Sequence, residues 1–259
     1  MTDETAPPAE AADANADAEP SASPTEAESP SAGRQLVGFL RDVVIIIAVA
    51  LIISFLIKTF LIRSFFIPSE SMQPTLEVDD RIIVNQLVPE LVPVSRGDVV
   101  VFRDPGSWLL GTPPQPRTPI EAAGDWLLSL VGLSASDSEE HLVKRVIGVG
   151  GDRVVCCNDL GQLLINGVPI NEPYVRTPAG ASDVSGIDFQ VTVPDGALWV
   201  MGDNRYESSD SRYNRTGDTE GFVPLDDVVG RAVVISWPLD RWIWLDNYPL
   251  TFDGVERAE

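Results

Sequence analysis

An uncharged apolar run near the N-terminus constrains this chain more than any other feature. Residues 43–57 carry no charge, and Ser54 is the only polar side chain among them. A helix that spans a bilayer needs about 20 apolar residues. The run reaches that length if the charged groups of Arg41 and Lys58 extend to the two membrane interfaces. The sequence therefore predicts a transmembrane helix over residues 36–62.

Two other interpretations of the run fit the sequence less well. A helix in a soluble core would show a polar stripe, and residues 43–57 have none. A cleaved signal peptide would begin with a short basic segment, whereas the preceding segment is long and acidic. The orientation in the membrane is not decided by charge, because Arg34 and Arg41 lie on one side and Lys58 and Arg63 on the other.

The first 33 residues have the composition of a disordered segment. They contain eight Asp or Glu, no Lys or Arg, and many Ala, Pro and Ser. Such a segment buries too little apolar surface to offset its chain entropy, so we expect a disordered acidic tail over residues 1–35. A solubilising extension without further function is the simplest interpretation of it. The net charge of −21 for the whole chain argues against a nucleic-acid partner.

Beyond the apolar run the pattern changes to short apolar segments separated by turn residues, which is typical of strands. The expected strands are 79–88, 96–102, 141–149, 152–157, 163–170, 188–194, 197–202 and 228–237. Asn166-Gly167 between apolar residues is a hairpin signal. The sequence therefore predicts a mainly β domain over residues 63–259.

One interval interrupts this pattern. Residues 104–140 are rich in Pro, Gly and Ser and contain one helical segment at 119–133. We interpret the interval as an insertion between strands. Two placements of its apolar face remain open, against the β domain or against lipid.

The chain offers little for a metal site. Its two cysteines, Cys156 and Cys157, are adjacent, and His141 is the only histidine, so zinc ligation is disfavoured. A strained disulfide between the neighbours and a pair of small thiols are both open. We predict neither a metal nor a cofactor, and we interpret His141 as structural.

The chain has only two lysines. Lys58 flanks the apolar run at the expected membrane interface, but no interface explains the position of Lys144. It lies in LVKRVIGV, inside an apolar strand segment. Because neighbouring strand residues face opposite sides, Lys144 faces the same way as Leu142 and Val146. Burial lowers the pKa of an amine, and a neutral amine can act as a general base. A lysine at a strand end that extends its amine to solvent is the alternative.

The segment IPSESMQPTL offers that base a nucleophile. Pro68 and Pro74 stiffen the chain, and in extended backbone Ser69 and Ser71 point to the same side. One hydroxyl can attack a carbonyl while the other donates to the resulting oxyanion. Serine–lysine pairs are an alternative to histidine-based triads. Ordinary turn chemistry is the competing interpretation of these serines.

Four motifs together resemble a known family. In chain order they are PSESMQPTL (68–76), RGDVVVF (96–102), KRVIGVGGD (144–152) and GDNRYESSDSR (202–212). Their order and spacing resemble those of bacterial type I signal peptidases, also known as leader peptidases, of peptidase family S26. The resemblance covers residues 36–240. The segments DPGSWL and DSEEHLVKRVIG are similar to the actinobacterial members.

The resemblance implies both a fold and an activity. The implied fold is a mainly β, signal-peptidase/SOS-repressor-like catalytic domain of β-barrel type with one N-terminal transmembrane helix. The implied activity is that of a membrane-bound serine endopeptidase with a Ser-Lys dyad. It removes signal peptides from exported preproteins after small residues at positions −1 and −3.

The resemblance also implies a role for individual residues. Ser71 corresponds to the nucleophile, Lys144 to the general base, and Ser69 to the side-chain donor of the oxyanion hole beside the backbone N–H of Ser71. Ser208 corresponds to a residue that hydrogen-bonds and orients Lys144. Asp210 supports the site through a salt bridge, for which the two candidate partners are Arg145 and Arg212.

Two positions depart from the family pattern. Glu70 stands where the family usually has Gly, and strand parity predicts that its carboxylate points away from the two serines. Tyr206-Glu207 stands where Asp-Asn is usual. This departure bears only on the detailed conformation of the loop before Ser208.

The resemblance also suggests where the protein works and what surrounds it. It implies a single-pass protein of the cytoplasmic (inner) membrane, with the acidic tail cytoplasmic and the catalytic domain extracytoplasmic. The expected partners are signal peptides, the lipid bilayer and nearby secretion machinery. The substrate adds as a strand, and apolar residues near Ile67, Met72 and Val84 are candidate pocket walls.

Two rival functions make different demands on the sequence. A self-cleaving protein of the SOS-repressor kind would carry an N-terminal DNA-binding region and no membrane span, and residues 1–62 show the reverse. A membrane-anchored module that only binds peptides would have no need for paired serines or for Lys144 in a core.

Overall fold

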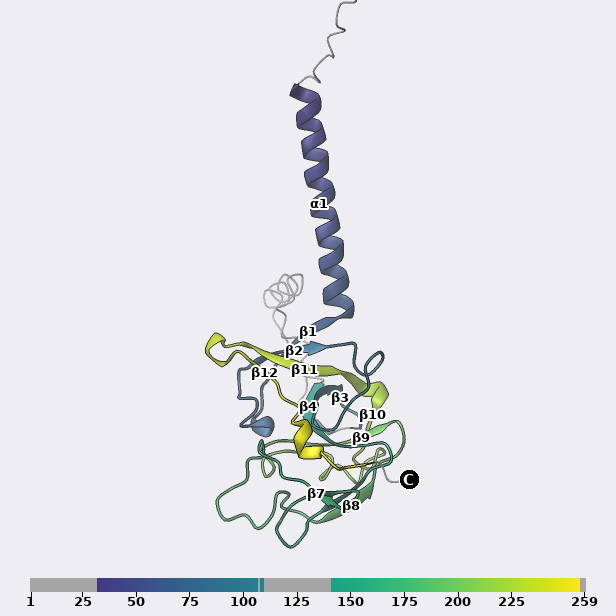
Figure 1. Ribbon diagram of the computed structural model, residues 1–259, viewed down its shortest axis with the longest axis vertical. Coiled ribbons are helices and arrows are strands. Elements are labelled where there is room, and N and C mark those ends of the chain that lie inside the picture. The colour runs from purple at the N-terminus through teal and green to yellow at the C-terminus, as the bar shows by residue number, and fades with distance from the viewer. Residues whose placement is uncertain (1–31, 107, 110–140, 257–259) are drawn as a thin grey trace, which may run out of the picture. The chain divides into compact units, whose positions relative to one another are not determined.

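The computed structural model describes residues 32–106, 108–109 and 141–256 (Figure 1). The chain divides into two compact units, residues 1–49 and 50–259. Helix α1 (Ala32–Phe60) begins in the first unit and ends in the second. Residues 1–31 of the expected tail and the expected helix at 119–133 lie outside the described residues.

Helix α1 arises from the apolar run. It begins at Ala32, before the expected start at residue 36, and ends at Phe60 rather than at residue 62. Among the described residues it is the helix long and apolar enough to cross a membrane, over Leu36–Phe55. Large apolar side chains such as Ile46 and Phe55 are exposed along it. Because a core helix buries such side chains, the exposure argues against a soluble core helix.

The second unit contains two antiparallel sheets. The larger has the order β1-β2-β11-β3-β4-β9-β10, with β12 also paired to β11. Its strands are β1 (Ile62–Phe66), β2 (Arg81–Asn85), β3 (Val99–Arg103), β4 (His141–Val149), β9 (Ala197–Met201), β10 (Val223–Pro224), β11 (Val228–Trp237) and β12 (Ile243–Trp244).

The smaller sheet has the order β7-β6-β5-β8. Its strands are β5 (Arg153–Cys156), β6 (Leu164–Ile165), β7 (Val168–Pro169) and β8 (Phe189–Thr192). In Figure 1 β1 and β2 lie at one end of the unit, and β7 and β8 lie at the other. The turn between β6 and β7 is the predicted hairpin, in which Asn166 and Gly167 both have positive φ, as a two-residue turn of this kind requires.

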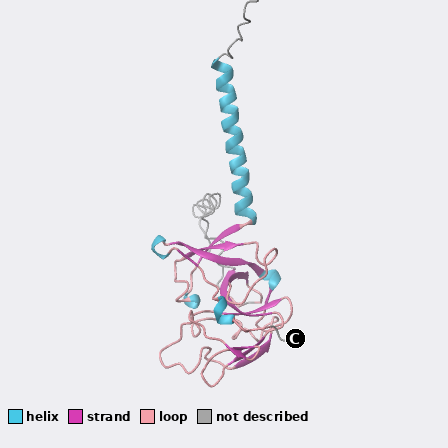
Figure 2. Cartoon of the chain, in the orientation of Figure 1, coloured by secondary structure: helices cyan, strands magenta, loops and turns pink. Residues whose placement is uncertain are grey.

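The mainly β class is confirmed, as Figure 2 shows. Each of the eight expected strand segments overlaps at least one strand. The expected barrel is not closed among the described strands, because β1 and β10 end the path of the larger sheet without pairing with each other. Three strands were not expected. β10 and β12 are two residues long, and β1 follows the apolar helix almost directly, so its own pattern is obscured.

The apolar cores follow from these sheets. One cluster packs the smaller sheet against β9 and includes Trp199 and Phe189. A second lies beneath β1 and β2 and includes Ile67 and Met72. Because Ile67 and Met72 are almost fully buried, they fix the segment between them, which contains both candidate serines.

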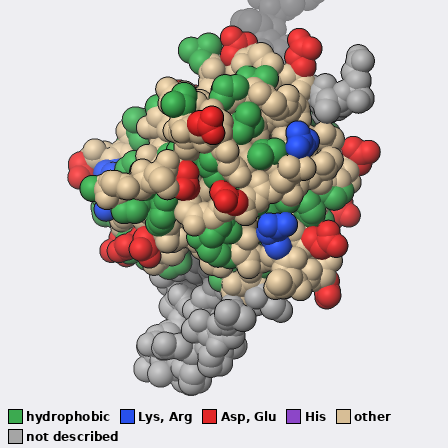
Figure 3. All heavy atoms as spheres, turned by 90° about the horizontal axis from the view of Figure 1, so that it is seen from below, with side chains coloured by type: hydrophobic (Ala, Val, Ile, Leu, Met, Phe, Trp, Pro, Cys, Tyr) green, Lys and Arg blue, Asp and Glu red, His purple; other side chains and the backbone are tan. Residues whose placement is uncertain are grey.

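Charge is distributed on the surface as the composition suggests. The face seen in Figure 3 carries scattered Asp and Glu side chains with few Lys or Arg between them. This agrees with the net charge of −21 for the chain.

A buried carboxylate joins three separate parts of the unit. Asp152 is fully buried after β4 and accepts two hydrogen bonds from Arg96, at 2.7 and 2.6 Å. It also accepts from the backbone N–H of Val149 at 2.8 Å and from the side chain of Asn166 at 3.0 Å. The carboxylate therefore links the segment before β3, the β4–β5 turn and the β6–β7 hairpin.

We expect Asp152→Ala to destabilise the folded chain by about 3–5 kcal/mol, because it leaves the Arg96 guanidinium without its partner. Thermal or denaturant unfolding of the detergent-solubilised chain measures this loss. Asp159→Ala is the matched control, since Asp159 is an exposed aspartate that follows β5. Equal free energies of unfolding for the two variants would contradict the structural role assigned to the Asp152 carboxylate.

Candidate active site

The structure brings Ser71 and Lys144 into direct contact. The Nζ atom of Lys144 lies 2.8 Å from the Oγ atom of Ser71, to which it donates a hydrogen bond. It also donates to the backbone carbonyl of Val143 at 3.1 Å. Both side chains are buried, with 3% of Lys144 and 8% of Ser71 exposed. The alternative of a lysine that extends to solvent therefore does not apply.

Strand β4 explains why Lys144 is buried. Leu142 and Val146, which share its side of the strand, belong to an apolar cluster with Val100 and Val200. Arg145, on the other side, is fully buried as well. Both faces of β4 are thus covered at this point, and the amine remains within the protein.

The serine segment folds differently from the expectation. Ser69 is extended, with φ −126° and ψ 157°, but Glu70–Met72 forms one turn of 3-10 helix. The expected extended backbone was wrong at this turn. Pro68 and Pro74 restrain only themselves and the residues before them, Ile67 and Gln73, so residues 70–72 are free to turn. The Oγ atoms of Ser69 and Ser71 nevertheless lie 3.3 Å apart.

Glu70 lies within this turn, so strand parity does not apply to it. Its side chain is exposed. Its backbone carbonyl accepts a hydrogen bond from the side chain of Asn204 at 3.1 Å. The backbone N–H of Asn204 donates to the carbonyl of Ser71, also at 3.1 Å. Asn204 therefore holds the serine turn against the loop that follows β9.

Burial also changes the chemistry of the amine. Loss of water around Lys144 lowers its pKa from 10.5 to about 8. The carboxylates of Asp210 and Asp203 oppose this decrease, and the guanidinium of Arg212 adds to it. Above pH 8 most of the amine is therefore neutral and able to accept a proton.

The two nearby carboxylates are each paired with a different arginine. Arg212 binds Asp210 through two hydrogen bonds of 2.8 and 2.7 Å. Arg145 binds Asp203 in the same way, at 2.8 and 2.7 Å. Of the two candidate partners for Asp210, the structure thus selects Arg212. All four side chains are buried.

Arg145 is held by more than its carboxylate. Its Nη1 atom donates to the carbonyl of Gly97 at 2.7 Å, and its guanidinium carbon lies 4.0 Å from the ring centroid of Tyr174. Asp203 accepts a further hydrogen bond from Thr75 at 2.5 Å. Sequence reasoning missed Asp203, Thr75 and Tyr174. Asp203 and Thr75 each lay in a motif, GDNRYESSDSR and PSESMQPTL, whereas Tyr174 lay in none of the four.

Ser208 is close to the pair but does not contact the amine. Within the part of the chain that the structure describes, its buried Oγ atom has no hydrogen-bond partner. The hydrogen bond from Ser208 to Lys144 that the resemblance implies is therefore not formed. A Cβ atom placed on Gly202 would collide with Ser208 and with the carbonyl oxygen of Ser71. The side chain of Ser208 and the carbonyl of Ser71 therefore both pack directly against Gly202.

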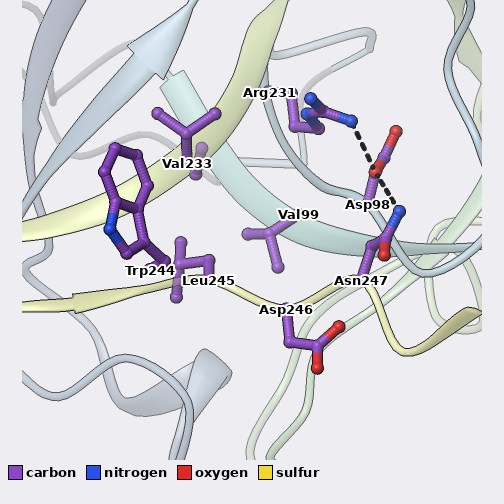
Figure 4. Close-up of a pocket in the computed structure, with 9 residues that line it drawn as sticks. Asp98, Val99, Arg231, Val233, Trp244, Leu245, Asp246 and Asn247 are labelled. Atoms are coloured by element: carbon purple, nitrogen blue, oxygen red, sulfur yellow. Dashed lines mark hydrogen bonds and ion pairs between the residues drawn. The ribbon is translucent and has the colours of Figure 1, made fainter.

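A cavity of about 310 Å³ lies apart from this pair (Figure 4). It lies beside the end of β12 and the residues that follow it, 245–247, and Val99, Val233 and Trp244 form part of its wall. Neither Ser71 nor Lys144 lines it. Asp246 lines it, and its backbone carbonyl accepts a hydrogen bond from Arg145 at 3.2 Å, so this arginine connects the cavity to the site.

The cysteines do not form a thiolate metal site. The sulfur atoms of Cys156 and Cys157 and a carboxylate oxygen of Asp183 all lie within 4.8 Å of one another. The two cysteines form a disulfide with each other, which resolves the alternatives left open by the sequence. Bonded sulfurs are not thiolates, the form in which cysteine ligates metals.

A mainly β protein with an N-terminal apolar helix and a buried serine–lysine contact has the features of a serine peptidase without a histidine base. The family model "Signal peptidase, peptidase S26" matches residues 40–237. The chain therefore belongs to the signal peptidase family, peptidase S26, and is a serine peptidase of the signal peptidase I class.

Individual relatives agree with the family match. A probable signal peptidase I of Mycobacterium leprae (strain TN) is 42% identical, over 68% of this chain and 68% of its own length. Signal peptidase I of Mycobacterium tuberculosis (strain CDC 1551 / Oshkosh) is 40% identical, over 78% of this chain and 74% of its own. Signal peptidase I of Leptolyngbya laminosa is 34% identical, over 86% of this chain and 88% of its own length.

We expect Gly202→Ala to reduce peptidase activity by about 100-fold or more, because the added methyl group displaces the Ser71 carbonyl or Ser208. Cleavage rates of a model preprotein measure this loss. Gly106→Ala is the control, since its added methyl would meet nothing closer than 3.8 Å, at Thr219. A Gly202→Ala enzyme as active as the control would contradict the close approach.

Proposed function

We propose that this protein removes signal peptides from exported preproteins, with Ser71 as nucleophile and Lys144 as general base. The observation that carries the proposal is the buried contact of 2.8 Å between Lys144 Nζ and Ser71 Oγ. Family membership supports the substrate class, since relatives such as that of Mycobacterium tuberculosis are named signal peptidase I.

The chemistry follows from the geometry of the pair. Neutral Lys144 accepts the hydroxyl proton of Ser71, and the Oγ atom attacks the carbonyl carbon of the scissile bond. The protonated amine then gives its proton to the departing amine of the mature protein. An acyl-enzyme on Ser71 remains. Lys144 next deprotonates a water molecule, which attacks the ester carbonyl. The protonated amine returns the proton to Ser71 Oγ as the ester bond breaks, and the signal peptide is released with the enzyme restored.

Ser69 has the role of oxyanion donor in this proposal. Its exposed hydroxyl lies 3.3 Å from that of Ser71, on the side from which substrate can approach. Together with the backbone N–H of Ser71 it would donate to the oxyanion of the tetrahedral intermediate. Removing one such donor typically lowers kcat by 10²–10³-fold.

Strand β4 offers the substrate an edge. It pairs with β3 from His141 to Arg145, but its pairing with β9 begins only at Arg145. Among the described strands, none pairs with its other edge between Leu142 and Lys144. A signal peptide added there as a strand would pass the serine–lysine pair. This is the mode of binding that we propose.

The expected pocket walls are compatible with small side chains. Ile67, Met72 and Val84 pack in one apolar cluster beside the serine turn, and at most 2% of each is exposed. Such a packed wall leaves only shallow depressions for a substrate side chain. We therefore propose cleavage after small residues at positions −1 and −3.

Two buried ion pairs and Ser208 would support the reaction. Arg145 binds Asp203, and Asp210 is held by Arg212, so neither carboxylate is an unpaired charge near Lys144. Ser208 keeps its proposed role of orienting the amine. Its hydroxyl, which has no hydrogen-bond partner among the described residues, is available to Lys144 once Ser71 has become acylated.

The apolar helix suggests where the reaction takes place. α1 fits a membrane anchor, and a signal peptide is itself inserted in the membrane before cleavage. We propose a single-pass protein of the cytoplasmic membrane, with its N-terminus inside and the β unit outside. In that position the enzyme contacts lipid and lies near the secretion machinery that delivers its substrates.

The dyad is tested by Ser71→Ala and Lys144→Arg, each assayed for cleavage of a model preprotein. Both variants should lose at least about 10³-fold in rate, the first because the nucleophile is absent and the second because arginine stays charged. Ser209→Ala, at an exposed serine beside the site, is the control and should cleave the preprotein at the rate of the unaltered enzyme. Near-normal cleavage by either dyad variant would refute the mechanism.

The pH dependence of kcat/KM reports the amine in the free enzyme. Because the base works in its neutral form, the rate should rise with pH and level off above a midpoint near 8. Initial rates on one preprotein across about pH 6 to 10 measure the profile. A rate that is constant between about pH 6 and 9 would be inconsistent with Lys144 as base.

A further inference from the structure

We propose that the Cys156–Cys157 disulfide is a thiol–disulfide exchange site, and that its reduction by a dithiol slows the peptidase through residues 183–187. The coupling to activity rests on the proposed function of Ser71 and Lys144. The exchange site itself does not, because it can be observed without catalysis.

The position of the bond argues against a role in overall stability. A disulfide stabilises a fold mainly by restricting the unfolded chain, and the effect grows with the length of the loop that it closes. Cys156 and Cys157 are adjacent, so their bond closes no loop of intervening residues. The bond therefore acts on its immediate surroundings.

Those surroundings are partly buried and partly accessible. Cys156 ends β5 opposite Phe189, and 6% of it is exposed. Cys157 is only half-buried and packs against the same apolar cluster. A soluble dithiol can thus reach the sulfur of Cys157, while that of Cys156 is held in the core.

The disulfide lies against a short segment with a defined shape. A carboxylate oxygen of Asp183 is within 4.8 Å of both sulfurs. The same carboxylate accepts from the backbone N–H groups of Ser185 and Gly186, at 2.9 and 2.6 Å. Val184 packs against the cluster that contains Cys156. The conformation of residues 183–187 therefore depends on the space that the two sulfur atoms occupy.

This segment is bound directly to the loop that supports the candidate dyad. Arg205 donates to the carbonyl of Val184 at 3.2 Å, and Tyr206 donates to that of Asp183 at 3.2 Å. Arg212 donates to the carbonyl of Ser185. The segment thus contacts the arginine that holds Asp210.

Asp210 carries the connection to the nucleophile. It accepts from the backbone N–H of Gly202 at 2.9 Å, and Gly202 packs against the carbonyl of Ser71. A displacement of residues 183–187 therefore reaches the serine turn through two side chains, Arg212 and Asp210.

Reduction changes the space that the sulfurs need. A dithiol gives two electrons and two protons, the S–S bond breaks, two thiols form, and the reagent leaves as its own disulfide. The two unbonded sulfurs then require a van der Waals separation in place of a covalent bond. Because Cys156 is held by the core, Cys157 and the neighbouring Asp183–Val184 must adjust.

The experiment uses the full chain in detergent micelles and dithiothreitol as the dithiol. Mass spectrometry after alkylation counts free thiols, and any that appear belong to this pair, because the chain has no other cysteine. Cleavage of a cysteine-free model preprotein and amide hydrogen exchange are measured on the same samples. On reduction we expect about tenfold slower cleavage and faster exchange in residues 183–187, both reversed by reoxidation.

The double variant Cys156→Ala, Cys157→Ala is the control for the reagent. It should cleave at the rate of the reduced chain and show no response to dithiothreitol. If it does not fold, the reduced wild-type chain still tests the proposal. Three results would overturn the proposal: a disulfide that resists the dithiol in the folded chain, two free thiols with unchanged cleavage and exchange, or an equal response of the double variant.

These outcomes are distinguishable from a failure of the proposed function. The dyad variants at Ser71 and Lys144 are assayed on the oxidised chain alone. If they cut normally while reduction still increases exchange in residues 183–187, the dyad is wrong and the exchange site remains.

Discussion

The contact between Lys144 and Ser71 requires an amine that is buried and yet surrounded by few uncompensated charges. Burial favours the neutral amine, but Asp203 and Asp210 both favour the charged form. An unpaired carboxylate close to the amine would keep it protonated and useless as a base. The structure resolves this conflict by giving each carboxylate its own bidentate arginine, so that loss of solvation determines the pKa of Lys144.

These two ion pairs organise the polypeptide around the site. Buried ion pairs contribute little net stability, but breaking one leaves an uncompensated charge that costs several kcal/mol. Each arginine also binds distant carbonyl groups, that of Gly97 for Arg145 and that of Ser185 for Arg212. The pairs therefore connect β4 with the segment before β3, and the loop after β9 with the segment before β8. The same side chains that adjust the pKa of the amine also hold the serine turn in place.

How much of this could be predicted depends on whether the signal is local. The alternation of apolar residues predicted the strands, and Asn166-Gly167 predicted the hairpin. The burial of Lys144 followed from its position within an apolar strand. The turn at Glu70–Met72 was not predicted, because no local signal marks it. Which arginine binds which carboxylate, and whether neighbouring cysteines are bonded, depends on tertiary contacts that the sequence does not display.

The most direct test of the account is the titration of the Lys144 amine itself. The chain has only two lysines, Lys58 and Lys144, so selective lysine labelling gives two side-chain NMR signals that single substitutions can assign. In the oxidised, substrate-free chain we expect the Lys144 signal to titrate with a midpoint near 8. A midpoint at the ordinary lysine value of 10.5 would show an amine that stays charged, and the serine–lysine mechanism would then be wrong.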